Sequence, residues 1–240
     1  MERRLAKLLI VTPTYNEAEN IPSLVAAIFH SNPEAHLLFV DDNSQDGTKD
    51  LIRHEQKRRP EQIFMLERAG KLGLGTAYLE GFNWGLQKSY SFFQEMDADL
   101  SHDPIMVPRF LDQLGSNDVV IGSRYVSGGG TKNWGLLRKF ISRGGSLYAR
   151  TILGLKIKDL TGGYNLWKRE VLENINLSNV KSEGYAFQIE LKYRAAKKNF
   201  SLTEVPITFV DRRAGYSKMS TMIVFEAMIR VLKLKWLVKQ

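Results

Sequence analysis

The sequence has no cysteine, few histidines and no long apolar run. Without cysteine there is no disulfide framework and no thiolate metal site, so any metal would be held by oxygen or by histidine nitrogen. The 4 histidines stand at spacings that match neither a metal site nor a catalytic triad. No apolar stretch approaches the roughly 20 residues needed to cross a bilayer. The basic N-terminus has too short an apolar run for a signal peptide, so we expect a cytoplasmic protein.

Carboxylates are missing from residues 124–158, although the chain has 26 Asp and Glu in all. The same segment contains eight Lys and Arg residues, which equals the formal net charge of +8. Such a block suits an anionic partner, which could be nucleic acid, anionic lipid or a phosphate-bearing substrate. A solvated surface is the plainer interpretation. It is disfavoured because apolar residues are interleaved with the charges, among them Trp134, Phe140, Ile141, Tyr148 and Ile152.

The first half of the chain alternates strand-like and helix-like patterns. A helix is expected over residues 20–29, with Asn20 as its cap, and strands are expected in "KLLIVTPTYNE", "HLLFVDD", "IFMLER", "SFFQEMD" and "DVVIGSRY". This alternation predicts an α/β fold, with a Rossmann-like and mostly parallel sheet covered by helices on both faces. The second half predicts further helices and one strand over "LTEVPITFVDR". No repeat or linker divides the chain, so residues 1–240 are expected to form one domain.

Acidic residues gather at the ends of the predicted strands. Asp41, Asp42, Asp97 and Asp99 all follow a strand, and so does Arg124. In open parallel sheets ligands bind outside the carboxyl ends of the strands, which predicts a site at this edge. The Asp97 and Asp99 pair offers the hard oxygen atoms that Mg²⁺ or Mn²⁺ prefers, with substrate phosphates as further ligands.

Three neighbouring segments extend this pattern. Glu95 precedes Asp97 by two residues, so an extended chain would point both to one side, although Glu95 could instead face the core or pair with a base. Lys71 lies in "GKLGLGTA", which lacks the dinucleotide-binding spacing but could place a lysine near a phosphate. Arg212 and Lys218 lie in "FVDRRAGYSKMS", which predicts either a loop that closes over an anion or a plain surface turn.

Together these motifs resemble the dolichol-phosphate mannose synthases, inverting glycosyltransferases of family 2 with the GT-A fold. The resemblance runs nearly end to end and is carried by "VTPTYNEAENIP", "VDDNSQDGT", "KLGLGTAY", "MDADLSHDP", "GSRYVSGGG", "LTGGYNLWKREVL" and "EVPITFVDR" followed by "GYSK". It implies transfer of mannose from GDP-mannose to dolichyl or another polyprenyl phosphate at the cytoplasmic face of a membrane. It also implies a donor-binding half at about residues 1–123 and an acceptor-binding, membrane-facing half at about 124–240. This chain is similar in length to short members that are anchored by a partner subunit.

The resemblance also implies roles for individual residues. The donor would be bound by Pro13, Tyr15, Glu17, Val40, Asp42, Asp97, Ala98, Asp99, Arg212 and Lys218. Asp97 and Asp99 would hold the Mg²⁺ or Mn²⁺ ion, and Ser101 stands where some relatives have Gln, which leaves its part in ligation open. Asp99 and Arg124 would be catalytic. Arg124 and Arg138 would hold the acceptor phosphate, and because both lie in a segment free of carboxylates, we expect neither to have a local ion-pair partner.

Two further features bear on the reaction and on contact with a membrane. A lipid phosphate has its second pKa near about 6 and is mostly dianionic at pH 7, so it needs no general base, in keeping with the lack of a candidate histidine. If residues 134–152 form one helix, an apolar stripe lies opposite basic residues, which is typical of a membrane-interface helix and equally of a core-packed one. Gly144 and Gly145 could break that helix. The stripe comprises Trp134, Leu137, Ile141, Tyr148 and Ile152.

Three alternative functions differ in what they require of the sequence. A polyprenyl-phosphate glucosyltransferase, or another family 2 transferase that uses a UDP-sugar, would share all the motifs above. A nucleic-acid-binding protein would explain the positive charge, but it gives Asp97 and Asp99 no role, so we expect no nucleic-acid partner. A nicotinamide oxidoreductase would need a glycine fingerprint after the first strand, where "PTYNE" stands instead.

Overall fold

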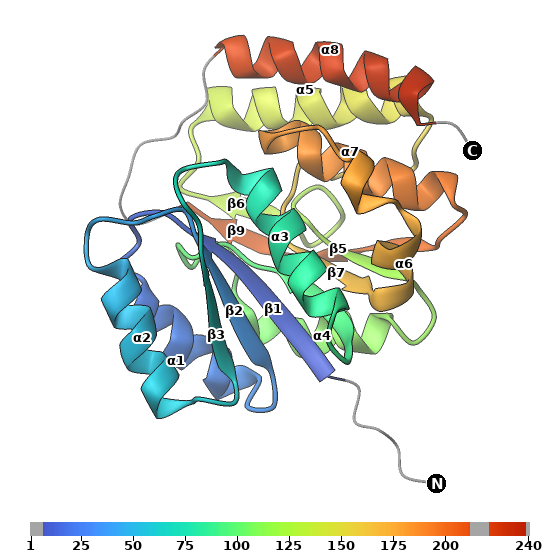
Figure 1. Ribbon diagram of the computed structural model, residues 1–240. Helices are drawn as coiled ribbons and strands as arrows, with labels where there is room; N and C mark the ends of the chain where they lie inside the picture. Colours follow the sequence, from blue (N-terminus) through green and yellow to red (C-terminus); the bar gives the residue numbers. More distant parts are fainter. Residues whose placement is uncertain (1–6, 212–220, 239–240) are drawn as a thin grey trace, which may run out of the picture.

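The computed structural model describes residues 7–211 and 221–238, and it is built around a seven-stranded sheet (Figure 1). The strand order is β3-β2-β1-β4-β7-β5-β8. Neighbouring strands are parallel except at β7, which runs antiparallel between β4 and β5. The predicted α/β fold with a mostly parallel sheet is therefore confirmed. The strands are β1 Lys7–Thr14, β2 His36–Asp41, β3 Ile63–Glu67, β4 Tyr90–Glu95, β5 Val119–Ser123, β7 Asn165–Lys168 and β8 Leu202–Pro206.

Helices cover both faces of the sheet because the central strands are apolar on both sides. In β1, for example, Leu9 and Val11 face one core, while Leu8 and Ile10 face the other. The second core is closed by α1 Ile21–Ser31, α2 Thr48–Arg58 and α4 Val107–Gln113, which follows a 3-10 turn at Pro104–Met106. The first is closed by α3 Leu74–Leu86, α5 Leu136–Leu153, α6 Arg169–Asn174, α7 Gly184–Lys197 and α8 Thr221–Leu237, with a 3-10 turn at Leu177–Asn179.

The second half departs from the predicted elements in two ways. The segment expected as one strand, "LTEVPITFVDR", is divided between β8 and a short strand β9 (Thr208–Val210), which pairs with β6 (Gly130–Lys132) in a separate two-stranded sheet. The division falls at Ile207, whose N–H donates to the Ser123 carbonyl at 3.0 Å. In addition, the sequence pattern does not predict β7 as a strand. Both departures result from pairing between residues far apart in the sequence.

The structure also refines the bounds of the first predicted helix and decides whether the glycine pair breaks the basic one. The first helix begins at Ile21 and ends at Ser31, and Asn20 occupies its cap position without making a side-chain cap bond. The Asn20 side chain donates instead to the Glu17 carboxylate at 2.7 Å. Helix α5 continues through Gly144 and Gly145, and α8 lies alongside it at one end of the molecule (Figure 1). None of the helices in the described ranges is long and apolar enough to cross a membrane.

Candidate active site

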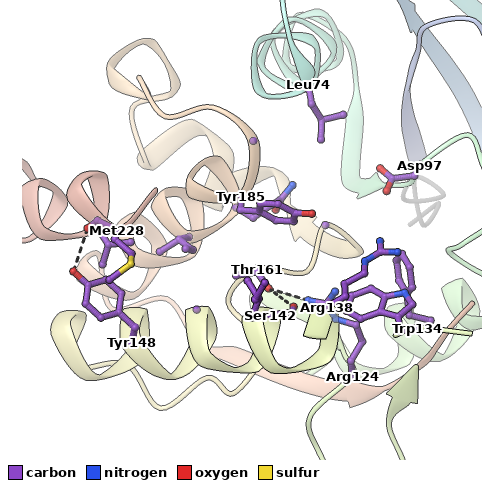
Figure 2. Close-up of a pocket in the computed structure, with 18 of the residues that line it drawn as sticks. Leu74, Asp97, Arg124, Trp134, Arg138, Ser142, Tyr148, Thr161, Tyr185 and Met228 are labelled. Atoms are coloured by element: carbon purple, nitrogen blue, oxygen red, sulfur yellow. Dashed lines mark hydrogen bonds between the residues drawn. The ribbon is translucent and has the colours of Figure 1, made fainter. Parts of the chain in front are cut away.

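A cavity of about 240 Å³ opens between the carboxyl ends of β4 and β5 and the helices α5, α7 and α8 (Figure 2). Three of the predicted site residues line it: Asp97, Arg124 and Arg138. They come from three different elements, since Asp97 follows β4, Arg124 follows β5 and Arg138 lies in the first turn of α5. The far wall is apolar and includes Ile141, Tyr148, Ile189, Met228 and Val231. The cavity therefore joins an acid, two arginines and an apolar chamber.

Asp97 is held at the cavity wall by two neighbours. The hydroxyl of the buried Tyr78 donates to Asp97 Oδ1 at 3.2 Å, and the backbone N–H of Asp97 donates to His102 Nδ1 at 3.1 Å. Burial lowers the pKa of His102, although nearby acids oppose that shift. Because Nδ1 accepts a hydrogen bond, the neutral ring carries its proton on Nε2, which lies 3.9 Å from Asp97 Oδ2. His102 also stacks on Tyr164, with ring centroids 4.6 Å apart. Its role is therefore to orient Asp97.

Asp99 and Ser101 lie in the turn that follows. Asp99 Oδ1 accepts the Ser101 backbone N–H at 3.1 Å, and the Ser101 hydroxyl is buried without a hydrogen-bond partner among the described residues. No cluster of three or more acids, histidines or cysteines that could hold a metal occurs within 7–211 and 221–238. Two carboxylates and an unsatisfied hydroxyl nevertheless fit a hard cation that takes its other ligands from a substrate diphosphate and water. Ala98, between the two aspartates, is buried.

Glu95 does not join the two aspartates. It is fully buried and accepts hydrogen bonds from the Trp167 indole at 2.7 Å and from Gln188 and Asn165. Burial raises its pKa to about 7, against the opposing effect of these donors and of Lys192. Glu95 and Asp97 do not point to one side, because the extended strand ends at Glu95. The alternative, that Glu95 faces the core, is the one that the structure supports.

Arg124 has no ion-pair partner nearby in the sequence, as expected, but the fold brings it a distant one. The fully buried Asp159 accepts from Arg124 Nε and a terminal nitrogen, both at 2.7 Å, and from its backbone N–H at 2.9 Å. Thr161 accepts a further bond at 2.9 Å. Burial alone would lower the pKa of Arg124, but the Asp159 carboxylate outweighs it and raises the pKa. A second buried cation, Lys192, donates to the carbonyls of Leu160 and Gly162 and so fixes the same loop.

Arg138 is also paired. One of its terminal nitrogens donates to Asp211 Oδ1 at 2.7 Å, across 73 residues of sequence. Both arginines of the carboxylate-free segment 124–158 therefore lack a local partner, as expected, and each pairs with an acid from outside the segment. Arg212 and Lys218, predicted to bind the donor, lie outside the described residues.

The remaining predicted donor residues lie along the same edge of the sheet but do not line the cavity. Lys71 Nζ stands 4.0 Å from the centre of the Tyr15 ring, which brings two predicted candidates together. Asp42 is buried in an ion pair with Arg68 and also accepts from the Gly73 N–H at 3.2 Å. The side chain of Val40 is fully buried in the core. The other two are Pro13, which pairs with Val40 in the strand register, and Glu17, whose N–H donates to Thr48 Oγ1 at 2.8 Å.

The predicted apolar stripe of residues 134–152 is divided by the structure. Ile141 and Tyr148 line the cavity, Ile152 packs against the core, and Trp134 precedes the helix and is buried. Of the five stripe residues only Leu137 is largely exposed. The exposed apolar side chains of α5 are Leu136, Leu137, Phe140 and Leu147.

Several residues that line the cavity, or that pair with its arginines, escape sequence reasoning. The spacing of His102 matches no triad, and no local pattern gives a role to Asp159, Thr161, Gln188 or Asp211. One signal is available for Asp159: it is the first acid after the long carboxylate-free segment. Nothing local marks Asp211 or Gln188, because Arg138 lies 73 residues from Asp211 and Glu95 lies 93 residues from Gln188.

Comparison with known proteins agrees with this geometry. The family model described as "Glycosyl transferase family 2" matches residues 9–175. The chain is 47% identical over 230 residues to a polyprenol monophosphomannose synthase of Mycolicibacterium smegmatis, covering 95% of this chain and 87% of that one. It is 44% identical over 225 residues to an undecaprenyl-phosphate mannosyltransferase of Micrococcus luteus, covering 94% and 92%.

Solved structures with the same fold are much more distant in sequence. A glucosyl-3-phosphoglycerate synthase from Mycobacterium tuberculosis, in complex with Mn²⁺, UDP and phosphoglyceric acid, superposes with a TM-score of 0.73 at 17% identity. The match covers 96% of this chain and 79% of that one. At this identity the likeness shows the fold alone. The family match over most of the chain and the two close relatives show more: this chain belongs to glycosyltransferase family 2.

Proposed function

We propose that this chain transfers mannose from GDP-mannose to dolichyl or another polyprenyl phosphate, with inversion at the sugar carbon, giving polyprenyl-phosphate β-mannose and GDP. The names of the two relatives support mannose and a polyprenyl phosphate acceptor. The observation that carries the proposal is the cavity, which joins Asp97 on the donor side to Arg124 and Arg138 and to an apolar chamber. A lipid phosphate needs that combination, whereas a water-soluble acceptor would gain nothing from the apolar wall.

On the donor side, Asp97 and Asp99 would hold a Mg²⁺ or Mn²⁺ ion, with Ser101 nearby. The ion would neutralise the charge that develops on the departing diphosphate. Tyr78 bonds the Asp97 carboxylate and His102 bonds the Asp97 backbone N–H, so both help to hold this residue in place, which limits reorganisation during the reaction. The nucleotide would be bound along the edge that holds Pro13, Tyr15, Glu17, Val40, Ala98 and Asp42, with Arg212 and Lys218 on its phosphates.

On the acceptor side, the reaction depends on the positioning of the acceptor phosphate rather than on proton transfer. A phosphate oxygen attacks the anomeric carbon, the bond from that carbon to the GDP oxygen breaks, and GDP leaves with the electron pair. The attacking phosphate is already mostly dianionic at pH 7, so no base is required. His102, buried and engaged with Asp97, is not needed as one. Arg124 and Arg138 would hold two anions close together against their mutual repulsion, and the inverted product follows from this single displacement.

The surface formed by α5 and α8 would lie against a membrane. Leu136 and Phe140 are 84% and 77% exposed, and Trp236 on α8 is 79% exposed. Basic residues flank this apolar surface, namely Lys139, Arg143 and Arg150 on α5 and Lys233 and Lys235 on α8. Exposed apolar groups bordered by cations suit the interface of a bilayer with anionic lipids. We therefore propose a protein that associates peripherally with the cytoplasmic face of a membrane, with a membrane-anchoring subunit as a further partner.

The activity is tested with radiolabelled GDP-mannose and UDP-glucose, each with and without undecaprenyl phosphate, followed by organic extraction. We expect label in the lipid phase only with GDP-mannose, the acceptor and a divalent cation together. The anomeric C–H coupling of the product then reports its configuration. Transfer from UDP-glucose in place of GDP-mannose would support the alternative glucosyltransferase, and labelled sugar in water alone would refute a lipid acceptor.

Membrane binding is tested by sedimentation with vesicles of phosphatidylglycerol and phosphatidylcholine. Phe140→Glu places a charge in the apolar surface and should abolish sedimentation. Ile105→Glu is the matched control, because Ile105 is also an exposed apolar residue but lies in the 3-10 turn packed near α1. Equal loss by both variants would refute the α5 and α8 surface as the contact. Absence of wild-type binding to lipid alone would favour the anchoring subunit.

A further inference from the structure

Trp134 lies at the end of the cavity where the two arginines meet (Figure 2). It follows β6 and precedes α5, so its backbone is fixed by a strand on one side and a helix on the other. Its side chain is 8% exposed. The helix that begins two residues later has several exposed apolar side chains. Trp134 is too well buried for membrane contact to explain it.

The indole contacts both guanidinium groups. The Cζ atom of Arg138 is 4.1 Å from the centroid of the Trp134 ring, and the Cζ atom of Arg124 is 5.2 Å from it. Two like charges repel, and the π face of a tryptophan is the aromatic surface that best attracts a cation. The ring of Phe209 meets Trp134 edge-on, with centroids 5.3 Å apart, and supports it from β9. Trp134 therefore contacts both arginines at once and offsets part of the repulsion between them.

Two N–H donors at this place have no hydrogen-bond partner within the described part of the chain. Trp134 Nε1 and Arg138 Nε are buried, and neither makes a hydrogen bond with any residue that the structure describes. A buried indole N–H is usually hydrogen-bonded, because leaving it unpaired forfeits its hydration. Both donors belong to side chains that contact each other and line the same cavity. Since both atoms are covered, an incoming oxygen reaches them only when a neighbouring side chain shifts.

We propose that Trp134 is a binding residue for the phosphate of the acceptor. Its π face holds Arg124 and Arg138, and its Nε1–H donates to a phosphate oxygen beside Arg138 Nε. The inference rests on the proposed function for the identity of the acceptor, but the chemistry it requires is only a phosphate monoester in this cavity. Inorganic phosphate shares that chemistry, so the test includes it as a separate arm.

The direct test is the indole N–H spectrum of ¹⁵N-labelled protein. The chain has 4 tryptophans, and Trp→Phe replacement at 134 assigns the signal of interest. The probe is citronellyl phosphate, with citronellol as the ligand that lacks the phosphate. We expect the Trp134 signal to move downfield with citronellyl phosphate, to move less with inorganic phosphate and to stay in place with citronellol. A signal that stays in place while calorimetry shows citronellyl phosphate binding would overturn the proposal.

Kinetics provide the second test. Trp134→Phe keeps an aromatic face but removes the N–H, and a hydrogen bond to a charged group is worth enough to raise the KM for undecaprenyl phosphate by roughly 10-fold or more. The KM for GDP-mannose should change less than about twofold. Trp134→Leu, which removes the face as well, should raise the acceptor KM further. Trp84→Phe is the control, because Trp84 packs on Phe64 and Tyr90 away from the cavity.

The outcomes separate this inference from the proposed function. If the wild type makes the lipid-linked mannose and Trp134→Phe has a normal acceptor KM with no shift of the N–H signal, the role of Trp134 fails alone. If no product forms but citronellyl phosphate still moves the Trp134 signal, the phosphate site stands and the proposed reaction fails.

Discussion

The ion pair between Arg124 and Asp159 predicts a large loss of stability when its charge is unbalanced. Asp159→Asn keeps the shape of the side chain and removes the charge, leaving Arg124 buried with its counter-ion gone and Lys192 close by as a second cation. Breaking a buried ion pair from one side typically costs about 3–5 kcal/mol. In a domain of this size, a loss of about 1 kcal/mol in the free energy of unfolding lowers the thermal unfolding midpoint by roughly 2–4 °C. The midpoint of this variant should therefore fall by about 6–20 °C.

The measurement is urea unfolding together with calorimetry, compared with two other variants. Asp50→Asn removes a carboxylate from the exposed pair with Arg53 and should cost less than about 1 kcal/mol. The double variant Arg124→Met, Asp159→Leu replaces the buried pair by apolar side chains and should recover much of the loss. It should nevertheless fail to use the acceptor, which separates the structural part of Arg124 from its part in catalysis. A single Asp159→Asn variant within about 1 kcal/mol of the wild type would refute the reasoning.

Three further predictions concern the metal, the acceptor and the buried lysine. Asp99→Ala should abolish transfer without lowering the unfolding midpoint, and full activity after chelation of divalent cations would contradict the metal assignment. Arg138→Ala should raise the acceptor KM by roughly 10- to 100-fold, at about 1.5–3 kcal/mol for a charge-assisted bond, and a collapse of GDP-mannose affinity instead would contradict it. Burial lowers the pKa of Lys192 to about 8 from 10.5, so the unfolded chain binds more protons between these values and stability should rise with pH across that window. Lys192→Met should abolish this rise in urea midpoints, and an unchanged pH slope would refute the shift.

Much of the fold is predictable because it depends on local pattern. The apolar strands, which are buried on both faces, and the acids that follow them suffice to place Asp97 at the carboxyl edge of the sheet. What the sequence does not reveal depends on pairing across long distances. β7 runs antiparallel only because β4 and β5 flank it, and the step from β8 to β9 occurs where the chain leaves one sheet for another. Neither has a local signature in composition or periodicity.

The sequence identifies several of the residues that line the cavity, but it does not reveal the ion pairs that they form. Arg124 and Arg138 stand out in the sequence, but a segment without carboxylates offers them no local partner. Their partners stand 35 and 73 residues away, and only the fold brings them together. Glu95 is a further example. Alternation places it on the same side as Asp97 only if the chain stays extended, but the strand ends at Glu95. Sequence spacing therefore locates charged groups far better than it identifies their counter-ions.

The two arginines differ in what an incoming phosphate must displace. Asp159 is fully buried and holds Arg124 through three hydrogen bonds, so it cannot be exchanged without exposing a carboxylate to the core. Asp211 is partly exposed and holds Arg138 through one terminal nitrogen, which a phosphate dianion can take over. In the proposed function, Arg124 would thus be a fixed support and Arg138 an exchangeable ligand. If Arg124 and Arg138 hold the acceptor phosphate as proposed, their carboxylate partners offset part of the charge that draws an anion, so an apolar tail that fills the cavity would contribute to the choice of acceptor.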